Sequence, residues 1–343
     1  MMTNDLLSCL ARFPQAALGH AAATPLERAD HLSDDLGIDL WLKRDDVTGL
    51  GMGGNKVRQL AFYVGDAVEQ GADALLITGA VQSNFMRTAA AAGAKLGLSV
   101  HLQLEERVPT NDPLYNTGGN VFLDDLLGAE RRSYPEGEDE AGADRALGEW
   151  ADELRTAGKS PYIIPLGPGH PPLGALGYCV AAAEYLEQCQ EHTVHVVASG
   201  SGATHGGLLF GLRALGCQDP VLGICVRRPV GAQIPRLFDR CREIGELLEM
   251  ENPVHEDDIA LFDDSLAPGY GQMSPALTEA IQMMARREGV LLDPVYTGKV
   301  FAGLLALRRR GIIPDGERVV FWHTGGGPGL FGYQRILEEA MNP

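Results

Sequence analysis

Apolar and polar positions along the chain predict short buried strands that alternate with longer helices. Compact apolar runs, typical of strands in a buried parallel sheet, occur at 75–78, 98–104, 162–165, 194–198, 221–226 and 319–322. Helical stretches are expected at 88–95, at 116–127 after its glycines, and at 174–190, with another after residue 206. The acidic, alanine-rich stretch at 136–158 is expected to form an exposed helix. This alternation indicates an α/β protein with two open, twisted, mostly parallel sheets flanked by helices.

The chain shows no internal repeat and no low-complexity linker. Its 343 residues suffice for one large or two medium domains with a sizeable core. We expect two α/β domains with the active site in the cleft between them.

Composition narrows the partners and the compartment. The net charge of −18 argues against nucleic acid and anionic membranes as partners, although a local field still allows an anionic substrate. No secretory signal opens the chain, and no apolar run reaches the length of a membrane span. The six cysteines form no Cys-x-x-Cys pair and the nine histidines show no metal spacing, so we expect no metal site and a reducing, cytoplasmic environment.

The first candidate for chemistry is Lys56, which follows the glycine pair of Gly53-Gly54-Asn55-Lys56. Glycines let the backbone approach a ligand closely, and a lysine beside them can act as an amine nucleophile for a Schiff-base cofactor. A surface turn with a solvated lysine is the alternative interpretation. A P-loop is excluded because no serine or threonine follows Lys56.

The loop at 200–206 follows an expected strand and precedes an expected helix, so backbone N–H groups and the positive helix end converge there. Three interpretations remain open: a phosphate-monoester site, an NADP site and a plain turn. The third glycine of a dinucleotide fingerprint comes one residue late, at Gly206, and the next strand ends in Arg227-Arg228, so only an NADP version of that fingerprint would be compatible.

Other polar positions stand at strand-to-loop transitions. Ser83 and Asn84 precede the alanine-rich helix, where they serve either as an N-cap or as a carboxylate site. Tyr270 and Tyr296 lie in glycine-containing loops, where tyrosines pack, stack on a flat ring or act as acid and base.

Taken together, the motifs resemble a family of pyridoxal-phosphate enzymes, the group of D-cysteine desulfhydrase, L-cysteate sulfo-lyase and 1-aminocyclopropane-1-carboxylate (ACC) deaminase. The resemblance runs from Lys43 to Phe331. It rests on the order and spacing of Lys-Arg-Asp-Asp (43–46), Gly-Gly-Asn-Lys (53–56), Gln-Ser-Asn (82–84), Gly-Ala-Leu-Gly-Tyr (174–178), Ala-Ser-Gly-Ser-Gly (198–202), Leu-Asp-Pro-Val-Tyr (292–296) and His-Thr-Gly-Gly (323–326).

The resemblance implies a tryptophan-synthase-β type of fold and a homodimer. Residues 1–58 and 167–343 would form the large domain, and residues 59–166 the small one. Lys56 would join pyridoxal phosphate covalently, and Asn84 would bond its phenolic oxygen. The residues that would cradle its phosphate are Gly200, Ser201, Gly202, Ala203 and Thr204.

The resemblance also implies roles at the substrate end. Tyr296 would stack near the ring and Tyr270 would face the substrate. Thr324 would be the neutral partner of the pyridine nitrogen, with Thr297 as another candidate. Ser83 would help to hold the substrate carboxylate. A hydroxyl partner does not enforce a protonated ring, which disfavours transamination and is compatible with β-elimination.

The expected activity is therefore β-elimination and deamination of a small β-substituted amino acid, of the D-cysteine or L-cysteate type, to pyruvate, ammonia and sulfide or sulfite. Lys56 would remove the α-proton, and Tyr270 or Ser83 would protonate the leaving group.

Departures from the family concern the substrate pocket. Relatives usually carry His or Gln at the position of Phe85 and Glu at the position of Ala61. Around Gly167 they usually read Gly-Gly-Ser, whereas this chain reads Gly-Pro-Gly-His up to His170. The deaminase branch carries Glu where this chain has Thr297, which argues against ring opening. The alternatives are ACC deaminase, a relative with a remodelled pocket for another amino acid, an NADP-dependent oxidoreductase, and a catalytically silent amino-acid-binding relative.

Overall fold

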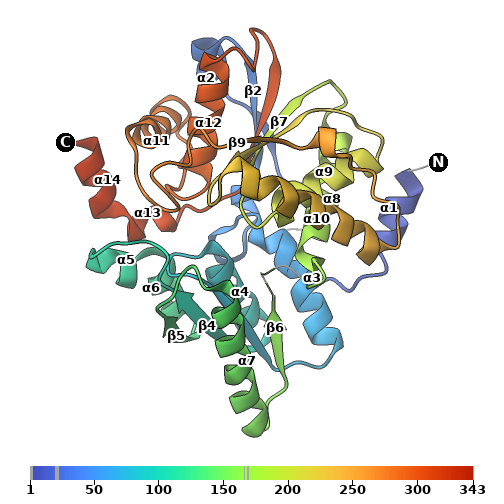
Figure 1. Cartoon of the computed structure of the whole chain (residues 1–343), viewed down its shortest axis with the longest axis vertical. Coiled ribbons are helices and arrows are strands. Elements are labelled where there is room, and N and C mark those ends of the chain that lie inside the picture. The colour runs from blue at the N-terminus through green and yellow to red at the C-terminus, as the bar shows by residue number, and fades with distance from the viewer. Residues whose placement is uncertain (1–2, 20–22, 166, 168–169, 343) are drawn as a thin grey trace.

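The computed structural model describes residues 3–19, 23–165, 167 and 170–342, and within them the strands form two sheets (Figure 1). The first sheet has six strands in the order β1, β2, β10, β7, β8 and β9. Its strands are β1 (Leu26–Arg28), β2 (Asp39–Arg44), β7 (Val194–Ser199), β8 (Val221–Cys225), β9 (Ala260–Phe262) and β10 (Arg318–His323). Strand β1 runs antiparallel to β2, and the other neighbours run parallel.

The second sheet has four parallel strands in the order β5, β4, β3 and β6, and lies in the lower half of Figure 1 with α7. Its strands are β3 (Ala74–Ala80), β4 (Ser99–Glu105), β5 (Glu130–Tyr134) and β6 (Pro161–Ile164). Two mostly parallel sheets flanked by helices confirm the predicted fold class.

Helices cover the faces of both sheets, as buried parallel strands require. They are α1 (Thr3–Leu10), α2 (Asp30–Leu36), α3 (Lys56–Glu69), α4 (Asn84–Leu96), α5 (Pro113–Thr117), α6 (Gly119–Leu126), α7 (Glu140–Thr156), α8 (Leu173–Gln188), α9 (Ala203–Ala214), α10 (Val230–Leu248), α11 (Pro275–Glu288), α12 (Thr297–Arg309), α13 (Gly329–Gly332) and α14 (Gln334–Met341). Short 3₁₀ helices lie at Asp45–Val47, Leu50–Met52 and Glu256–Asp258. None of the helices in the described ranges combines the length and the apolar character needed to cross a bilayer.

One helix prediction is confirmed and another needs correction. The helix expected in 116–127 after its glycines is α6, which begins at Gly119, and a separate short helix, α5, ends before it at Thr117. Helix α7 was expected to be exposed, yet Leu147 and Trp150 on one face are buried against Leu76 of β3. Its polar composition describes only the outer face.

Helix α8 fixes the positions of two neighbouring helices. A side chain at Gly177 of α8 would collide with the backbone of Arg58 in α3, and one at Gly207 of α9 would collide with the backbone of Ala175 in α8. Glycines at both contacts let the three helices approach closely. The start of α3, where Lys56 lies, and the start of α9 are thereby held in one arrangement.

The carboxyl ends of the parallel strands meet where the two sheets face each other. Strands β10, β7 and β8 end next to Thr324, Gly200 and Val226, and strands β3 and β4 of the other sheet end close to Ser83 and Arg107. All five residues line one pocket. Ligands in open α/β sheets bind at such edges, so the topology points to this pocket as the functional site.

Candidate active site

Lys56 begins α3 at the floor of this pocket. It follows Gly53 and Gly54, whose φ values of 71° and 113° belong to the region that favours glycine. The backbone N–H of Asn55 donates to the carbonyl of Thr324 at 3.0 Å, which ties the turn to the end of β10. The residue is half-buried, and its amine points into the pocket.

The amine of Lys56 is suited to act as a nucleophile. Its Nζ donates to Oε1 of Gln59 at 3.2 Å, and no carboxylate of the described residues lies within ion-pairing distance. Burial therefore lowers the pKa of Lys56 to about 8, because nothing compensates for the desolvated charge. A larger fraction of the amine is neutral near neutral pH than for an ordinary lysine, as attack on an aldehyde requires.

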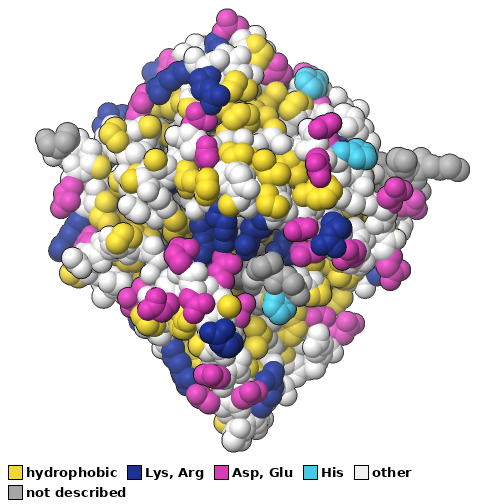
Figure 2. Space-filling view, in the orientation of Figure 1, with side chains coloured by type: hydrophobic (Ala, Val, Ile, Leu, Met, Phe, Trp, Pro, Cys, Tyr) yellow, Lys and Arg dark blue, Asp and Glu magenta, His cyan; other side chains and the backbone are white. Residues whose placement is uncertain are grey.

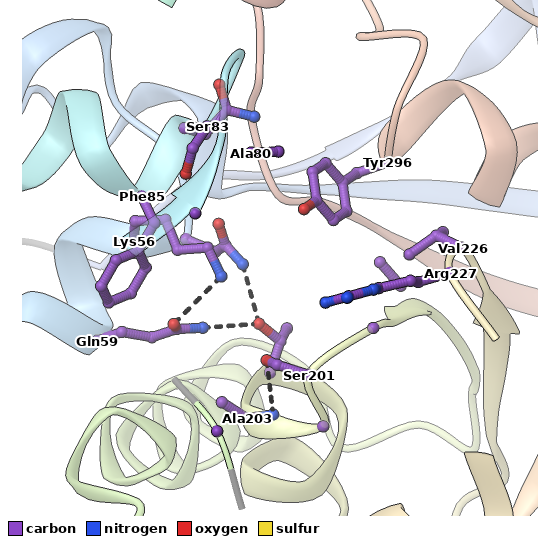
Figure 3. Close-up of a pocket in the computed structure, with 18 of the residues that line it drawn as sticks. Lys56, Gln59, Ala80, Ser83, Phe85, Ser201, Ala203, Val226, Arg227 and Tyr296 are labelled. Atoms are coloured by element: carbon purple, nitrogen blue, oxygen red, sulfur yellow. Dashed lines mark hydrogen bonds between the residues drawn. The ribbon is translucent and has the colours of Figure 1, made fainter. Parts of the chain in front are cut away.

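The loop between β7 and α9 forms the opposite wall. Gly202 has a φ of 91°, and Ala203 starts a helix of 12 residues whose N-terminal N–H groups face the pocket. The hydroxyl of Thr204 accepts hydrogen bonds from Asn55 Nδ2 at 2.9 Å and Gln59 Nε2 at 2.8 Å. Figure 3 shows these bonds joining the loop to the Lys56 segment.

The helix α4 brings three predicted residues to the pocket. Ser83 is its N-cap and accepts from the backbone N–H of Met86 at 3.3 Å, so the capping interpretation is confirmed, and the residue also lines the pocket. Oδ1 of Asn84 accepts from Asn120 Nδ2 at 3.1 Å. Phe85 is buried, with its ring centroid 5.2 Å from the Nζ of Lys56.

Tyr270 and Tyr296 form a pair. Their hydroxyl oxygens are 2.8 Å apart, and their rings meet edge to face with centroids 5.9 Å apart. Burial raises the pKa of both phenols, which keeps them protonated and able to donate. Asp293 accepts from the backbone N–H of Tyr296 at 3.0 Å and fixes one of them.

Lys299 fixes the loop that carries the other tyrosine. Its side chain is fully buried in α12, and its Nζ donates to the carbonyls of Leu266 at 2.7 Å and Gly269 at 2.5 Å. Because Lys299 lies three residues after Tyr296, the two tyrosines are connected through one short segment.

The two candidate hydroxyl partners of a pyridine nitrogen differ in position. Thr324 lines the pocket, whereas the hydroxyl of Thr297 donates to Oδ1 of Asp293 at 2.7 Å and accepts from its backbone N–H at 2.8 Å. Thr297 is fully buried beside the pocket and is absent from its lining. Thr324 is therefore the better placed of the two candidates, since the hydroxyl of Thr297 is bonded to Asp293.

The structure places the other departures at different points. His170 is exposed and lines the mouth, as does Gly167. Pro168 and Gly169, between them, lie outside the described residues. Ala61 is turned away from this pocket, and its carbonyl accepts from the N–H of Ala16 at 2.8 Å.

Thirteen of the fourteen predicted site residues thus line one pocket; Thr297 is the exception. Sequence reasoning considered Arg227 and Arg228 only for an NADP site, and it did not name several other lining residues: Asn55, Gln59, Tyr63, Thr78, Glu105, Arg107, Glu140, Asp144, Arg236 and Arg240. A signal existed for Gln59, which lies about one helical turn after Lys56. No sequence pattern connects Arg107 or Glu140 to the loop at 200–204.

The residues fit pyridoxal phosphate. A lysine amine with a lowered pKa is available for the aldehyde, and the N-terminus of α9, with its free N–H groups and partial positive charge, faces the same space for the phosphate. A Cβ on Gly200 would lie 3.3 Å from Cγ2 of Val226 and 3.9 Å from Cε1 of Tyr296, so the glycine keeps this wall open.

Comparison with known proteins defines the class. The model of the family described as pyridoxal-phosphate dependent enzyme matches residues 17–325, and the chain belongs to this family. It is a pyridoxal-phosphate-dependent enzyme, as the motifs predicted. Neither sequence nor structural likeness supports the NADP interpretation.

Curated relatives narrow the class. The chain is 42% identical over 334 residues to a D-cysteine desulfhydrase of Klebsiella pneumoniae (strain 342), covering 96% of this chain and 99% of the relative. It is 43% identical over 328 residues to a D-cysteine desulfhydrase of Salmonella typhi, covering 94% and 97%. The predicted resemblance to the D-cysteine desulfhydrase group is thereby confirmed.

Comparison with solved structures supports the same family and fold. The crystal structure of an ACC deaminase homologue superposes with a TM-score of 0.87 at 37% identity, covering 98% of this chain and 99% of the other. Threonine deaminase isoform 2 of Solanum lycopersicum superposes with a TM-score of 0.68 at 16% identity, covering 100% and 94%, and supports the fold alone.

Proposed function

We propose that this enzyme is a lyase that eliminates the β-substituent of a small amino acid of the D-cysteine or L-cysteate type. The products would be pyruvate, ammonia and sulfide or sulfite. The observation that carries the proposal is that Lys56, whose amine has no carboxylate partner among the described residues, lies in one pocket with the phenol pair of Tyr270 and Tyr296. This arrangement provides a base and a proton donor for one elimination.

The cofactor, when bound, supplies an aldehyde for the substrate's amino group and a conjugated ring that stabilises charge at the α-carbon. Lys56 would hold it covalently and then take the α-proton on Nζ. A substrate carboxylate would lie at the N-terminus of α4, where Ser83 and Asn84 supply polar groups. Thr324 would face the ring nitrogen as a neutral hydroxyl, which supports elimination over transamination.

The phenol pair would protonate the leaving group. The bond between the two hydroxyls lets one tyrosine orient the other, and their raised pKa values keep the proton in place until the carbon–sulfur bond lengthens. Phe85 and His170 would contact the substrate side chain and set its identity.

The larger organisation forms part of this proposal. Residues 59–166 would form the small domain and 1–58 with 167–343 the large one. Strands at 74–164 make the four-stranded sheet, and strands outside these residues make the other, which supports the division. The enzyme would act as a cytoplasmic homodimer on a small amino-acid substrate, without nucleic acid or membrane partners.

Pyruvate release tests the proposal. The purified enzyme should form pyruvate from D-cysteine, L-cysteate or another β-substituted alanine, and Lys56→Met should form none. Release of 2-oxobutyrate from 1-aminocyclopropane-1-carboxylate, with no pyruvate from any β-substituted alanine, would establish the deaminase alternative instead. Cofactor attachment without turnover of any of these compounds would identify a silent relative.

A further inference from the structure

Four arginines, all next to the six-stranded sheet, surround the loop at 200–204. Arg227 and Arg228 follow β8, Arg236 and Arg240 lie on α10, and all four line the pocket. Each has one nitrogen that is buried and lacks a hydrogen-bond partner among the described residues: Nε of Arg227, Nη1 of Arg228, Nε of Arg236 and Nε of Arg240. Buried donors without partners are costly, so several at one place call for an acceptor.

A single carboxylate faces three of these guanidinium groups. This carboxylate belongs to Glu140, the first residue of α7, which packs on the four-stranded sheet. Its carboxylate lies 2.9 Å from Nη1 of Arg227, 2.5 Å from Nη2 of Arg228 and 3.6 Å from Nη1 of Arg236. Burial would raise the pKa of Glu140, but these arginines overcome that effect and lower it.

The carboxylates near the four arginines pair with only part of each guanidinium group. Arg227 has a second contact with Glu138 at 3.3 Å, but that carboxylate is exposed and contributes little. Arg240 has its own partner, Glu243, at 2.8 Å. Figure 2 shows basic side chains gathered across the middle of one face, with acidic ones beside them. The carboxylates thus leave one buried nitrogen of each arginine without an acceptor among the described residues, and these nitrogens indicate a further anion.

The arginine cluster lies beside the loop at 200–204, which is the candidate phosphate site. A Cβ on Gly202 would be 3.5 Å from Cβ of Arg240 and 3.9 Å from the carbonyl oxygen of Arg236. Figure 3 shows the guanidinium of Arg227 extending into the pocket between Tyr296 and Ser201. The loop from Gly200 to Thr204 itself contains no cation, so Arg227 brings a full positive charge to a neutral cradle.

We propose that Arg227, Arg228 and Arg236 form a subsite for a tetrahedral oxyanion, and that Glu140 competes with this oxyanion for the same guanidinium groups. Planar guanidinium forks match phosphate and sulfonate oxygens in pairs. Two sources share this chemistry: the cofactor's phosphate, or a sulfonate or sulfinate on the substrate's β-carbon. The second source rests on the proposed elimination, whereas the subsite itself does not.

Inorganic sulfate is the probe, titrated by calorimetry at constant ionic strength into the full-length enzyme with and without cofactor. Arg227→Met should weaken sulfate binding about 10- to 100-fold, because a charge-assisted hydrogen bond is lost. Arg227→Lys should restore part of it. Glu140→Gln should tighten binding, because the competing carboxylate is removed. Matched controls are Glu149→Gln, exposed on the same α7, and Arg242→Met, exposed on α10; both should leave binding unchanged.

The two preparations distinguish the sources. Binding that disappears when the cofactor is loaded assigns the subsite to the cofactor's phosphate, and binding that persists assigns it to a substrate oxyanion. If Arg227→Met and Arg242→Met weakened sulfate binding equally, the effect would come from the net charge of the protein, and the proposal would be overturned. Weaker binding in Glu140→Gln would show that Glu140 only supports the structure, and would overturn it too. None of these readouts needs turnover, so they remain valid if the proposed elimination fails.

Discussion

The active-site pocket and the ion-pair network around Lys43 each enclose a lysine amine, and the two amines have different partners. Nζ of Lys43 contacts Oε1 of Glu184 at 2.5 Å, Oε1 of Gln188 at 2.7 Å and the carbonyl of Thr24 at 2.8 Å. Among the described residues, Nζ of Lys56 hydrogen-bonds to the amide oxygen of Gln59 and has no carboxylate partner.

Burial lowers the pKa of both lysines, but only at Lys43 does a carboxylate act against it. The same network joins Glu184 to Arg58, and Arg58 to the fully buried Asp45. Removing a compensated amine would leave its buried carboxylate partner without a counter-charge, whereas an amine without such a partner is more often neutral and free to react. The Lys-Arg-Asp-Asp motif therefore supports the fold beneath the pocket, and Gly-Gly-Asn-Lys supplies the candidate nucleophile.

The largest expected effect comes from Lys56→Met. Covalent cofactor attachment should be lost, and pyruvate release should fall at least about 10²-fold, as for removal of a general base. The free energy of unfolding of the apoprotein should not decrease, because no ion pair is broken. Borohydride reduction with peptide mapping measures cofactor attachment, and urea unfolding measures the free energy of unfolding. Lys159→Met, at an exposed position, is the control.

Lys43→Met should show the opposite pattern. Removing one partner from a buried pair lowers stability by about 3 kcal/mol, measured by urea unfolding of the apoprotein. The folded fraction should still attach the cofactor to Lys56, visible as the imine absorbance. A variant that keeps full stability but loses this absorbance would contradict the division between the two lysines.

The pH dependence of cofactor capture follows from the pKa of Lys56. Only the neutral amine attacks the aldehyde, so the capture rate of the apoprotein should rise with pH and reach half its maximum at about pH 8. Between pH 8 and the unfolded value of 10.5 the unfolded chain binds more protons, so this group's contribution makes stability rise with pH in that window. A midpoint near 10.5 in stopped-flow measurements would refute the assignment.

The smallest effect concerns Phe85. Its ring faces the ammonium form of Lys56 and stabilises that form weakly. Phe85→Leu should therefore lower the midpoint of cofactor capture by about half a pKa unit. A higher midpoint would mean that the ring acts mainly by excluding water.

The fold was predictable where burial is uniform. Strands β3, β7, β8 and β10 are buried along nearly their whole length, and their apolar runs identify them. Strands β1, β2, β5 and β9 were not predicted. β5 reads Glu-Arg-Arg-Ser-Tyr because it is an edge strand, and β2 contains Lys43, whose burial is explained only by Glu184, far along the chain.

The site was predictable where a motif is local. Lys56 and the loop at 200–204 each combine glycines with a functional group within a few residues, so the pattern marks them as candidates, and the family resemblance then selects among the interpretations that the pattern leaves open. Thr297 shows the limit, because only the packed structure reveals that its hydroxyl bonds to Asp293. Arg227 was noted as a strand end, but its orientation into the pocket depends on the loop, the tyrosine and α7 together.

The hydrogen bonds from Lys299 to the Leu266 and Gly269 carbonyls have a practical consequence for engineering. Because those contacts use main-chain oxygens, the side chains of the segment that carries Tyr270 can be varied without disturbing them. Libraries that randomise this segment while retaining Lys299 should yield altered substrate ranges in well-folded enzymes, whereas libraries that also change Lys299 should be dominated by inactive clones.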